Sequence, residues 1–366
     1  MKTLKSLLML GIAALLFGGC SNESDDNNKF TLTASRSEIM ANVEYSQLSV
    51  KLGKKELSAE EFVLYNEKGQ VVNLPNLRFT SDTPGSYSFQ AYHPTLNVMS
   101  DRVKIRVIKE IEFAEAPADE QPSNLNFTRA AMYIRFTGTN CGACPILASR
   151  LQSVLPEYEG RIYECTIHQY NSDDPAFLAS PQLGAVMGVD GYPYSVMDLN
   201  KQECASGTVS SNYIKQLFNN ALSRVEARAA IAASTRFDEE AQAVAVTVKI
   251  KANTPGEYRV GAWLLEDDVY GQQVGTTNKD LYFHDNCTRV VDSHNFASDY
   301  SGHSIGSLNS GEYGDKRFVF SIDDMWNVDN CHIAIFVSSK EGDKFFVNNI
   351  IDIPVKNGSV KFKYAE

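Results

Sequence analysis

The segment "FTGTNCGACP", residues 136–145, contains the two side chains whose spacing is best suited to chemistry: Cys141 and Cys144. An apolar run precedes them and a pattern of helical spacing follows, so we expect Cys141 between a strand and the N-terminus of a helix. Unpaired N–H groups and the helix dipole would lower the pKa of Cys141 there, and the small Gly142 and Ala143 would leave it accessible. The pattern predicts thiol–disulfide exchange, in which Cys141 attacks and Cys144 resolves.

A second motif, "GYPYSV", places Pro193 at the start of a predicted strand, 49 residues after Cys144. In thioredoxin-like folds a cis-proline at this point faces the cysteines and leaves the neighbouring backbone free to pair with an extended substrate. We therefore expect Pro193 and the Tyr192 backbone to present the substrate strand.

Two other interpretations of the cysteine pair remain open. A structural zinc site needs a second CxxC or a Cys/His pair, and none occurs at a regular spacing; we expect no metal and no cofactor. A static disulfide is favoured by Met132, which stands where thioredoxins place a buried acid, and by Asn140, which replaces the usual aromatic residue. The protein is therefore either a thiol–disulfide oxidoreductase or a non-enzymatic surface binding or scaffold protein in which the CxxC is a structural disulfide.

The remaining cysteines suggest other roles. Cys287 and Cys331 lie in the C-terminal β region, and we predict a structural disulfide between them. Cys165 is expected to be a buried, inert thiol. Cys204, near a hairpin turn, is a candidate for a second resolving thiol.

A polar cluster further along the chain has the residue types of metal ligands. No pair at i, i+4 on a helix supports a site, so a solvated loop is preferred. His168 either faces the cysteines or only ends a strand. The cluster consists of His284, Asp285, Asp292, His294 and His303.

The N-terminus has the pattern of an export signal. Lys2 and Lys5 precede an apolar run, residues 7–17, that is too short to span a bilayer. Gly18 and Gly19 before Cys20 resemble a bacterial lipobox, which predicts a signal peptide at residues 1–20 and a lipid on Cys20 that attaches the protein to a membrane. A plain secretory signal is the alternative. The polar, acidic residues 21–29 are predicted to be a tether.

The composition limits the partners. The net charge of −11 argues against nucleic acid, which would require a basic patch. The length of 366 residues indicates more than one domain.

The pattern along the chain predicts a multidomain protein of α/β and all-β parts. Alternating runs over residues 30–111, with a tyrosine-corner motif "TPGSYSF", predict an Ig-like β-sandwich. Residues 112–128 are expected to be a linker. The order β-α-β-(α)-β-β-α over residues 129–229 is that of a thioredoxin-like domain, with Pro156 kinking its first helix and Ser210 or Ser211 capping its last. Residues 230–366 are predicted to be a second β-sandwich.

Several segments together resemble a known family. "FTGTNCGACP", "IHQYNSDDP", "GYP", "YRVGAWLLEDDVYGQQ" and "FHDNCTRVV" resemble the Bacteroidota outer-membrane lipoproteins named for a twenty-eight-kilodalton founder. The resemblance begins near Arg129 and implies a lipid-anchored outer-membrane protein, on the cell surface or the periplasmic face, with a thioredoxin-like and a β domain. A cysteine-containing protein or a surface protein or glycan would be its partner. Members typically have an acidic pair where this chain has Ile134 and Arg135, and Trp where it has Asn140.

Overall fold

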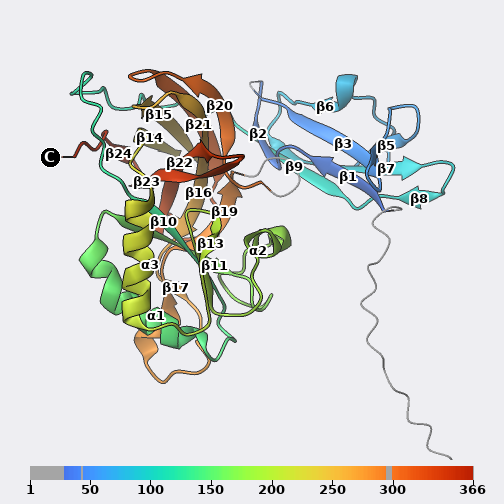
Figure 1. The fold of residues 1–366 in the computed structure, drawn as a ribbon. Coiled ribbons are helices and arrows are strands. Elements are labelled where there is room, and N and C mark those ends of the chain that lie inside the picture. Colours follow the sequence, from blue (N-terminus) through green and yellow to red (C-terminus); the bar gives the residue numbers. More distant parts are fainter. Residues whose placement is uncertain (1–28, 43, 294–298, 366) are drawn as a thin grey trace, which may run out of the picture. The chain divides into compact units, whose positions relative to one another are not determined.

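The computed structural model describes residues 29–42, 44–293 and 299–365, and it divides into two compact units (Figure 1). Unit 1 contains the described residues up to 39 together with residues 44–107, and unit 2 contains residues 40–42 and 108–365. Strands predominate in both. The predicted signal peptide, Cys20 and most of the tether lie outside the described residues.

Unit 1 consists of short antiparallel strands in two small sheets. One sheet has the order β1-β3-β4, with β6 on β3, and the other β2-β9-β7-β5, with β8 on β7. Alternate residues of β3, such as Leu48 and Val50, are buried, as a half-buried strand requires. The bounds are β1 (Phe30–Ala34), β2 (Glu38–Met40), β3 (Ser46–Leu52), β4 (Lys55–Glu56), β5 (Val63–Asn66), β6 (Arg78–Phe79), β7 (Gly85–His93), β8 (Val98–Met99) and β9 (Val103–Ile108).

A large sheet forms the centre of unit 2. Its order is β13-β12-β10-β11-β19-β16-β22-β23, with β20 also paired to β16. Strands β10 and β11 are parallel, whereas β12 and β13 continue the sheet antiparallel. The bounds are β10 (Ala131–Thr137), β11 (Ile162–His168), β12 (Tyr194–Met197), β13 (Asn200–Ser206), β16 (Gly256–Glu266), β19 (Cys287–Asp292), β20 (His303–Leu308), β22 (Cys331–Glu341) and β23 (Lys344–Pro354).

Three α-helices of the described chain cover the part of this sheet that contains β10. Helices α1 (Cys144–Val154) and α3 (Ser211–Arg224) pack on one face, where Leu147 and Phe218 meet Tyr133. Helix α2 (Pro181–Met187) lies on the other face, where Leu183 meets Ile134. As predicted, Ser210 caps α3 by accepting a hydrogen bond from the Tyr213 N–H. Likewise α1 gives way at Pro156 to the 3-10 helix η3 (Leu155–Tyr158).

A second sheet packs on the other end of the large one and makes a β-sandwich. Its order is β21-β15-β14-β24, and alternate residues of β15, such as Val246 and Val248, contact inward residues of β16 and β22, such as Val260 and Ile335. This apolar core lies between the two sheets. The bounds are β14 (Ala229–Asp238), β15 (Ala243–Ala252), β21 (Tyr313–Ser321) and β24 (Ser359–Val360).

The two predicted modules of unit 2 share one sheet. Strand β11 of the segment 129–229 pairs with β19 of the segment 230–366 at Thr166 and Cys287. The apolar cluster behind this junction also joins both segments, since Ile134 and Phe136 lie in it with Trp263 and Phe336. The hydrogen-bonded sheet therefore continues across the predicted domain boundary at residue 229. That two different folds meet there stays a prediction.

Candidate functional site

Cys141 and Cys144 form a disulfide between β10 and α1. Cys144 is the first residue of the helix, and its N–H donates to the Cys141 carbonyl over 3.3 Å, which closes a turn around Gly142 and Ala143. The exposed fractions are 3% for Cys141 and 1% for Cys144. The expectation that small neighbours leave Cys141 accessible is therefore wrong in this conformation.

A loop from the β region covers the cysteine turn. Strands β17 (Val269–Tyr270) and β18 (Phe283–His284) form a hairpin between β16 and β19, and its tip contains residues 271–276, here called the strap, followed by the 3-10 helix η4 (Lys279–Tyr282). The Val274 N–H donates to the Thr139 carbonyl over 2.8 Å. A Cβ added to Gly275, whose φ is +84°, would lie only 2.2 Å from the Gly142 carbonyl oxygen. The strap therefore lies directly on the residues that carry the disulfide.

Gln273 anchors the strap. Its side chain is buried, with 5% exposed, and its Nε2 lies 3.3 Å from the Gly138 carbonyl oxygen and 3.0 Å from those of Thr139 and Cys141. Three acceptors around one atom identify it as the amide nitrogen. Nothing in the spacing of "YGQQVG" indicated this contact, because it joins residues more than 130 positions apart.

The second predicted motif borders the same loop. The Tyr192–Pro193 peptide bond is cis. Tyr194 pairs with Phe136, so Pro193 lies beside the end of β10, where the cysteine loop begins. The Tyr192 ring contacts that of Tyr170 at 5.3 Å, and Gly138 packs so closely that an added Cβ would lie 2.5 Å from the Tyr170 Cβ. The structure thus brings both predicted motifs to one edge.

A buried polar network bonds to the loop that contains Cys141. Asp174 Oδ2 accepts a hydrogen bond from the Thr139 N–H over 2.7 Å and lies 2.9 Å from Nδ1 of His168. On the other side of the ring, Nε2 of His168 is 3.7 Å from Sγ of Cys287. The three side chains form a Cys–His–Asp chain that ends two residues before Cys141. The sequence did not decide whether His168 faces the cysteine pair or only ends a strand. In the structure it ends β11 and faces Cys287.

The charges of this network follow from its burial. Burial lowers the pKa of His168 and raises that of the Cys287 thiol well above its usual range, so both are neutral near pH 7. Burial alone would raise the pKa of Asp174, but the hydrogen bonds from His168, Thr139 and Ala176 outweigh it and lower the pKa. Neutral His168 then donates from Nδ1 to the Asp174 carboxylate, which leaves its Nε2 as an acceptor beside Cys287 Sγ. The Cys287 S–H donates to the His284 carbonyl over 3.4 Å. With Cys287 fully buried, this arrangement positions the loop and does not present a nucleophile.

The predicted disulfide between Cys287 and Cys331 does not form. Both are free, buried thiols. They pair with the same residue, Glu266 of β16, from opposite neighbouring strands, so two strand spacings separate them. That is about 10 Å, whereas a disulfide joins Cα atoms about 4–7 Å apart. Cys165 is buried and free, as expected, and Cys204 is free and half-buried.

The predicted polar cluster is dispersed. His284 is buried against His168 and bonds Gly271 O through Nε2 at 3.0 Å, and burial lowers its pKa to about 4. Asp292 and His303 form a separate pair at 2.5 Å, and His294 lies outside the described residues. No group of three or more His, Cys, Asp or Glu suited to a metal occurs among the residues the structure describes.

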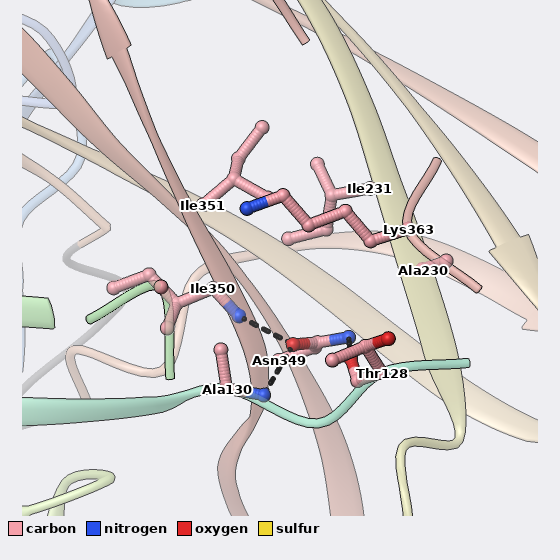
Figure 2. A pocket seen from close by; sticks show the side chains of 9 residues that line it. Thr128, Ala130, Ala230, Ile231, Asn349, Ile350, Ile351 and Lys363 are labelled. Atoms are coloured by element: carbon pink, nitrogen blue, oxygen red, sulfur yellow. Dashed lines mark hydrogen bonds between the residues drawn. The ribbon is translucent and has the colours of Figure 1, made fainter. Parts of the chain in front are cut away.

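A small pocket elsewhere in unit 2 offers no chemistry (Figure 2). Its central polar residue, Asn349, uses its amide oxygen to accept the N–H groups of Ala130 and Ile350, at 3.0 and 3.1 Å. Its amide nitrogen donates to the carbonyls of Thr128 and Ala229. Asn349 therefore ties β23 to two other segments and has no group left for a ligand.

Comparisons with known proteins identify the relatives. The family model described as outer membrane protein Omp28 matches residues 180–357, which include Pro193 and the strap and begin after the cysteine pair. No curated protein matches the chain. In the described residues, no helix has the length and apolar character to cross a bilayer.

Two solved structures are similar over part of the chain. A domain of the outer membrane lipoprotein Omp28 from Porphyromonas gingivalis is 19% identical, covers 36% of this chain and 89% of that one, and has a TM-score of 0.25. A structural-genomics protein from Agrobacterium tumefaciens is 11% identical, covers 63% and 96%, and has a TM-score of 0.39. These scores are too low to establish a common fold. The family match confirms the resemblance drawn from the sequence motifs and the outer-membrane location that it implied. Over residues 180–357, just under half of its length, the chain is similar to the family of the outer membrane protein Omp28.

Proposed function

We propose that this protein is a lipid-anchored outer-membrane protein whose Cys141–Cys144 pair exchanges disulfides with a cysteine-containing protein. The observation that carries the proposal is the position of the disulfide after β10 and at the first residue of α1. We also infer that residues 129–229 are thioredoxin-like. The parallel pair β10–β11, the antiparallel β12 and β13, and helices on both faces support this inference.

The proposed step conserves atoms and electrons. A thiolate of a reduced partner attacks Cys141 Sγ, the disulfide bond breaks, and the electron pair leaves on Cys144 Sγ, which takes a proton from water. A second partner thiolate attacks the partner sulfur of the mixed disulfide and releases Cys141, which is also protonated. The partner is oxidised to a disulfide, and the pair is reduced to a dithiol. In the reverse direction Cys141 attacks and Cys144 resolves.

The short loop argues that the bond is not mainly a staple. Cys141 and Cys144 are three positions apart. Closing so few residues removes little entropy from the unfolded chain, roughly 2 kcal/mol in the chain-entropy model, whereas bonds across long loops stabilise more. A pair selected only for stability would more usefully join distant segments.

Burial favours a second candidate function. Cys141 and Cys144 are 3% and 1% exposed, as expected for a fixed structural bond in a surface binding or scaffold lipoprotein. We propose an Ig-like fold for unit 1, supported by the Tyr87 hydroxyl, which donates to the Thr83 carbonyl over 2.9 Å as a tyrosine corner does. Such a domain would act as a spacer or bind a protein or glycan.

Trapping in living cells separates the two functions. In a Cys144→Ser variant, Cys141 can form a mixed disulfide that is not resolved, so exchange predicts covalent adducts with partner proteins. Cys141→Ser/Cys144→Ser is the control and should trap none. If the single variant traps nothing, and the double variant keeps its binding and cell phenotype, the scaffold function is correct.

The acidic tether suggests that the protein is displayed on the outer face of the membrane. Antibody labelling of intact cells tests this proposal. Labelling that appears only after the outer membrane is permeabilised would place the protein on the periplasmic face.

A further inference from the structure

We infer that the strap, residues 271–276, is a removable cover that keeps the Cys141–Cys144 disulfide closed to reaction until it opens. This inference rests on the proposed exchange function and adds its regulation. The strap reaches the cysteine turn at three successive residues: Gln273, Val274 and Gly275. Without an opening step, the low exposure of both cysteines would exclude attack by a partner thiolate.

A single segment of chain, the strap, lies between the cysteine turn and solvent. Gln273 points inward and is buried, whereas its neighbours Gln272, Val274 and Gly275 are exposed, with 49% of Val274 accessible. The outer side of the strap therefore faces water directly. Displacing these few residues would expose the turn beneath without opening the apolar core.

The bonds that hold the strap are of a kind that exchanges readily with water. The Gln273 amide donates to the carbonyls of Gly138, Thr139 and Cys141, and the Val274 N–H donates to Thr139. None is an ion pair, and each acceptor would be hydrated after opening. Because each of these hydrogen bonds is exchanged for one to water, its net contribution is small, and local opening costs less than unfolding the sheet.

The roots of the strap are held independently of its tip. Gly271 N–H donates to Tyr282 O over 2.8 Å, and the Gly271 carbonyl bonds His284 Nε2 at 3.0 Å. At the other end Asn278 caps η4 by accepting the Asp280 N–H. Gly271 therefore stays with the β17–β18 hairpin, and the rest of the strap, residues 272–276, can leave the turn.

The strap also occupies the groups that a substrate peptide would need. Its backbone bond from Val274 to Thr139 is the kind of main-chain contact that an extended polypeptide makes when it pairs with an exposed edge. Opening would release the acceptors at Gly138, Thr139 and Cys141 next to the disulfide. An extended, cysteine-containing segment of a partner protein would then take the place of the strap.

Two adjacent glutamines provide a matched test. The rate of disulfide reduction by dithiothreitol is measured for the full-length protein, for Gln273→Ala and for Gln272→Ala. Gln273→Ala loses the anchor, so reduction should be about tenfold faster. Gln272→Ala removes an exposed amide from the same loop and should stay within about twofold of the parent. Equal rates for all three proteins would overturn the cover.

Hydrogen exchange provides a test that requires no variant. If the strap opens locally, the Val274 N–H exchanges much faster than the buried amides of β16 in the native protein. Exchange of Val274 only at the rate of those amides would contradict the inference. Reduction of the disulfide by a protein dithiol separates the two proposals. If Gln273→Ala is reduced faster by dithiothreitol but no protein dithiol reduces any variant, the strap is a cover and the proposed exchange function is wrong.

Discussion

Cys287 and Cys331 lie level with the same residue, Glu266, one on each neighbouring strand of β16. Glu266 is buried between them, where it pairs with Arg289 at 2.7 Å and accepts the Asn327 N–H over 2.7 Å. Two cysteines can therefore be neighbours of one position in a sheet and still be too far apart to bond. Their burial, and not a cross-link, accounts for their place in the core.

The thiol inventory of the protein follows from this arrangement. We expect one disulfide, Cys141–Cys144, and four free thiols among the described residues, of which only the half-buried Cys204 reacts promptly with iodoacetamide in the native state. Burial raises the pKa of Cys331 to about 12 and that of Cys165 and Cys287 well above the usual range, so these thiols stay protonated. Mass spectrometry of alkylated peptides measures each site. A peptide pair linked through Cys287 and Cys331 would contradict the structure.

Asp174→Asn should destabilise the protein by about 1.5–3 kcal/mol, because the carboxylate accepts buried hydrogen bonds from His168, Thr139 and Ala176. The NH2 group of the asparagine would face one of these three donors, so one hydrogen bond would be lost. Urea unfolding measures the loss. As the pKa of Asp174 is lowered in the folded state, its contribution is present above about pH 4 and is lost as the pH falls further.

Comparing the parent and Asp174→Asn at several pH values tests whether the stabilisation by Asp174 is lost as the pH falls. The difference in unfolding free energy should be constant from pH 5 to 7 and shrink toward pH 3. Asp173→Asn, an exposed neighbour whose carboxylate contacts only Asn171 among the bonds described, is the control and should change little. A difference that grows with acid would show that Asp174 is not ionised in the folded protein.

His332→Gln should remove a stabilisation that is present near neutral pH and is lost at alkaline pH. His332 lies 2.6 Å from Asp352 and 3.2 Å from Asp267, and these carboxylates outweigh the effect of burial and raise its pKa to about 10. A raised pKa stabilises the fold fully below the unfolded value near 6.5, and this stabilisation is lost as the pH rises toward 10. We expect roughly 2 kcal/mol at pH 6, since both carboxylates are partly exposed and screened.

Urea unfolding of the parent and His332→Gln at pH 6, 8 and 10 measures this effect. The two curves should converge as the pH approaches 10. His93→Gln in unit 1 controls for the general effect of losing a histidine, because His93 is partly exposed and has no carboxylate partner in the bonds described. A constant difference across this range would mean that His332 is not charged by its partners.

Lys251→Met should cost about 3–5 kcal/mol, because removing one partner of a buried ion pair leaves the other uncompensated. Lys251 is fully buried, and its ammonium lies 2.8 Å from Asp119 and donates to the carbonyls of Gln121 and Asn124. It thereby holds the segment before β10 on β15. Lys249→Met is the matched control on the same strand. Its ammonium lies over the Tyr313 ring, a contact that contributes about 0.5–1 kcal/mol. Thermal unfolding compares the two, and equal losses would contradict the ion-pair argument.

The local part of the fold could be predicted from the sequence. Leu147, Leu151 and Val154 recur at helical spacing and lie on the buried face of α1. Ser210 caps α3, and the segments 131–137 and 162–168 are strands. These features depend on neighbouring residues, whose side chains alone decide the period and the cap.

The surroundings of the cysteines could not be predicted, because they depend on contacts across the chain. Gln273 reaches the cysteine turn from 132 positions away, and Asp174 reaches Thr139 from 35. Neither has a motif of its own. The Cys287–Cys331 prediction was wrong for the same reason: the cysteine count suggests pairs, but strand order decides which residues are within bonding distance.

The continuous sheet of unit 2 has a practical consequence for anyone who wishes to express part of this protein. A fragment truncated at residue 229 would lack β19 and lose its pairing with β11 at Thr166. In the same fragment Ile134, Phe136 and Ile167 would lose Trp263 and Phe336 from their shared cluster. An uncovered edge beside exposed apolar residues recruits other chains. Such a fragment is expected to precipitate, and its redox behaviour would say nothing about the intact lipoprotein.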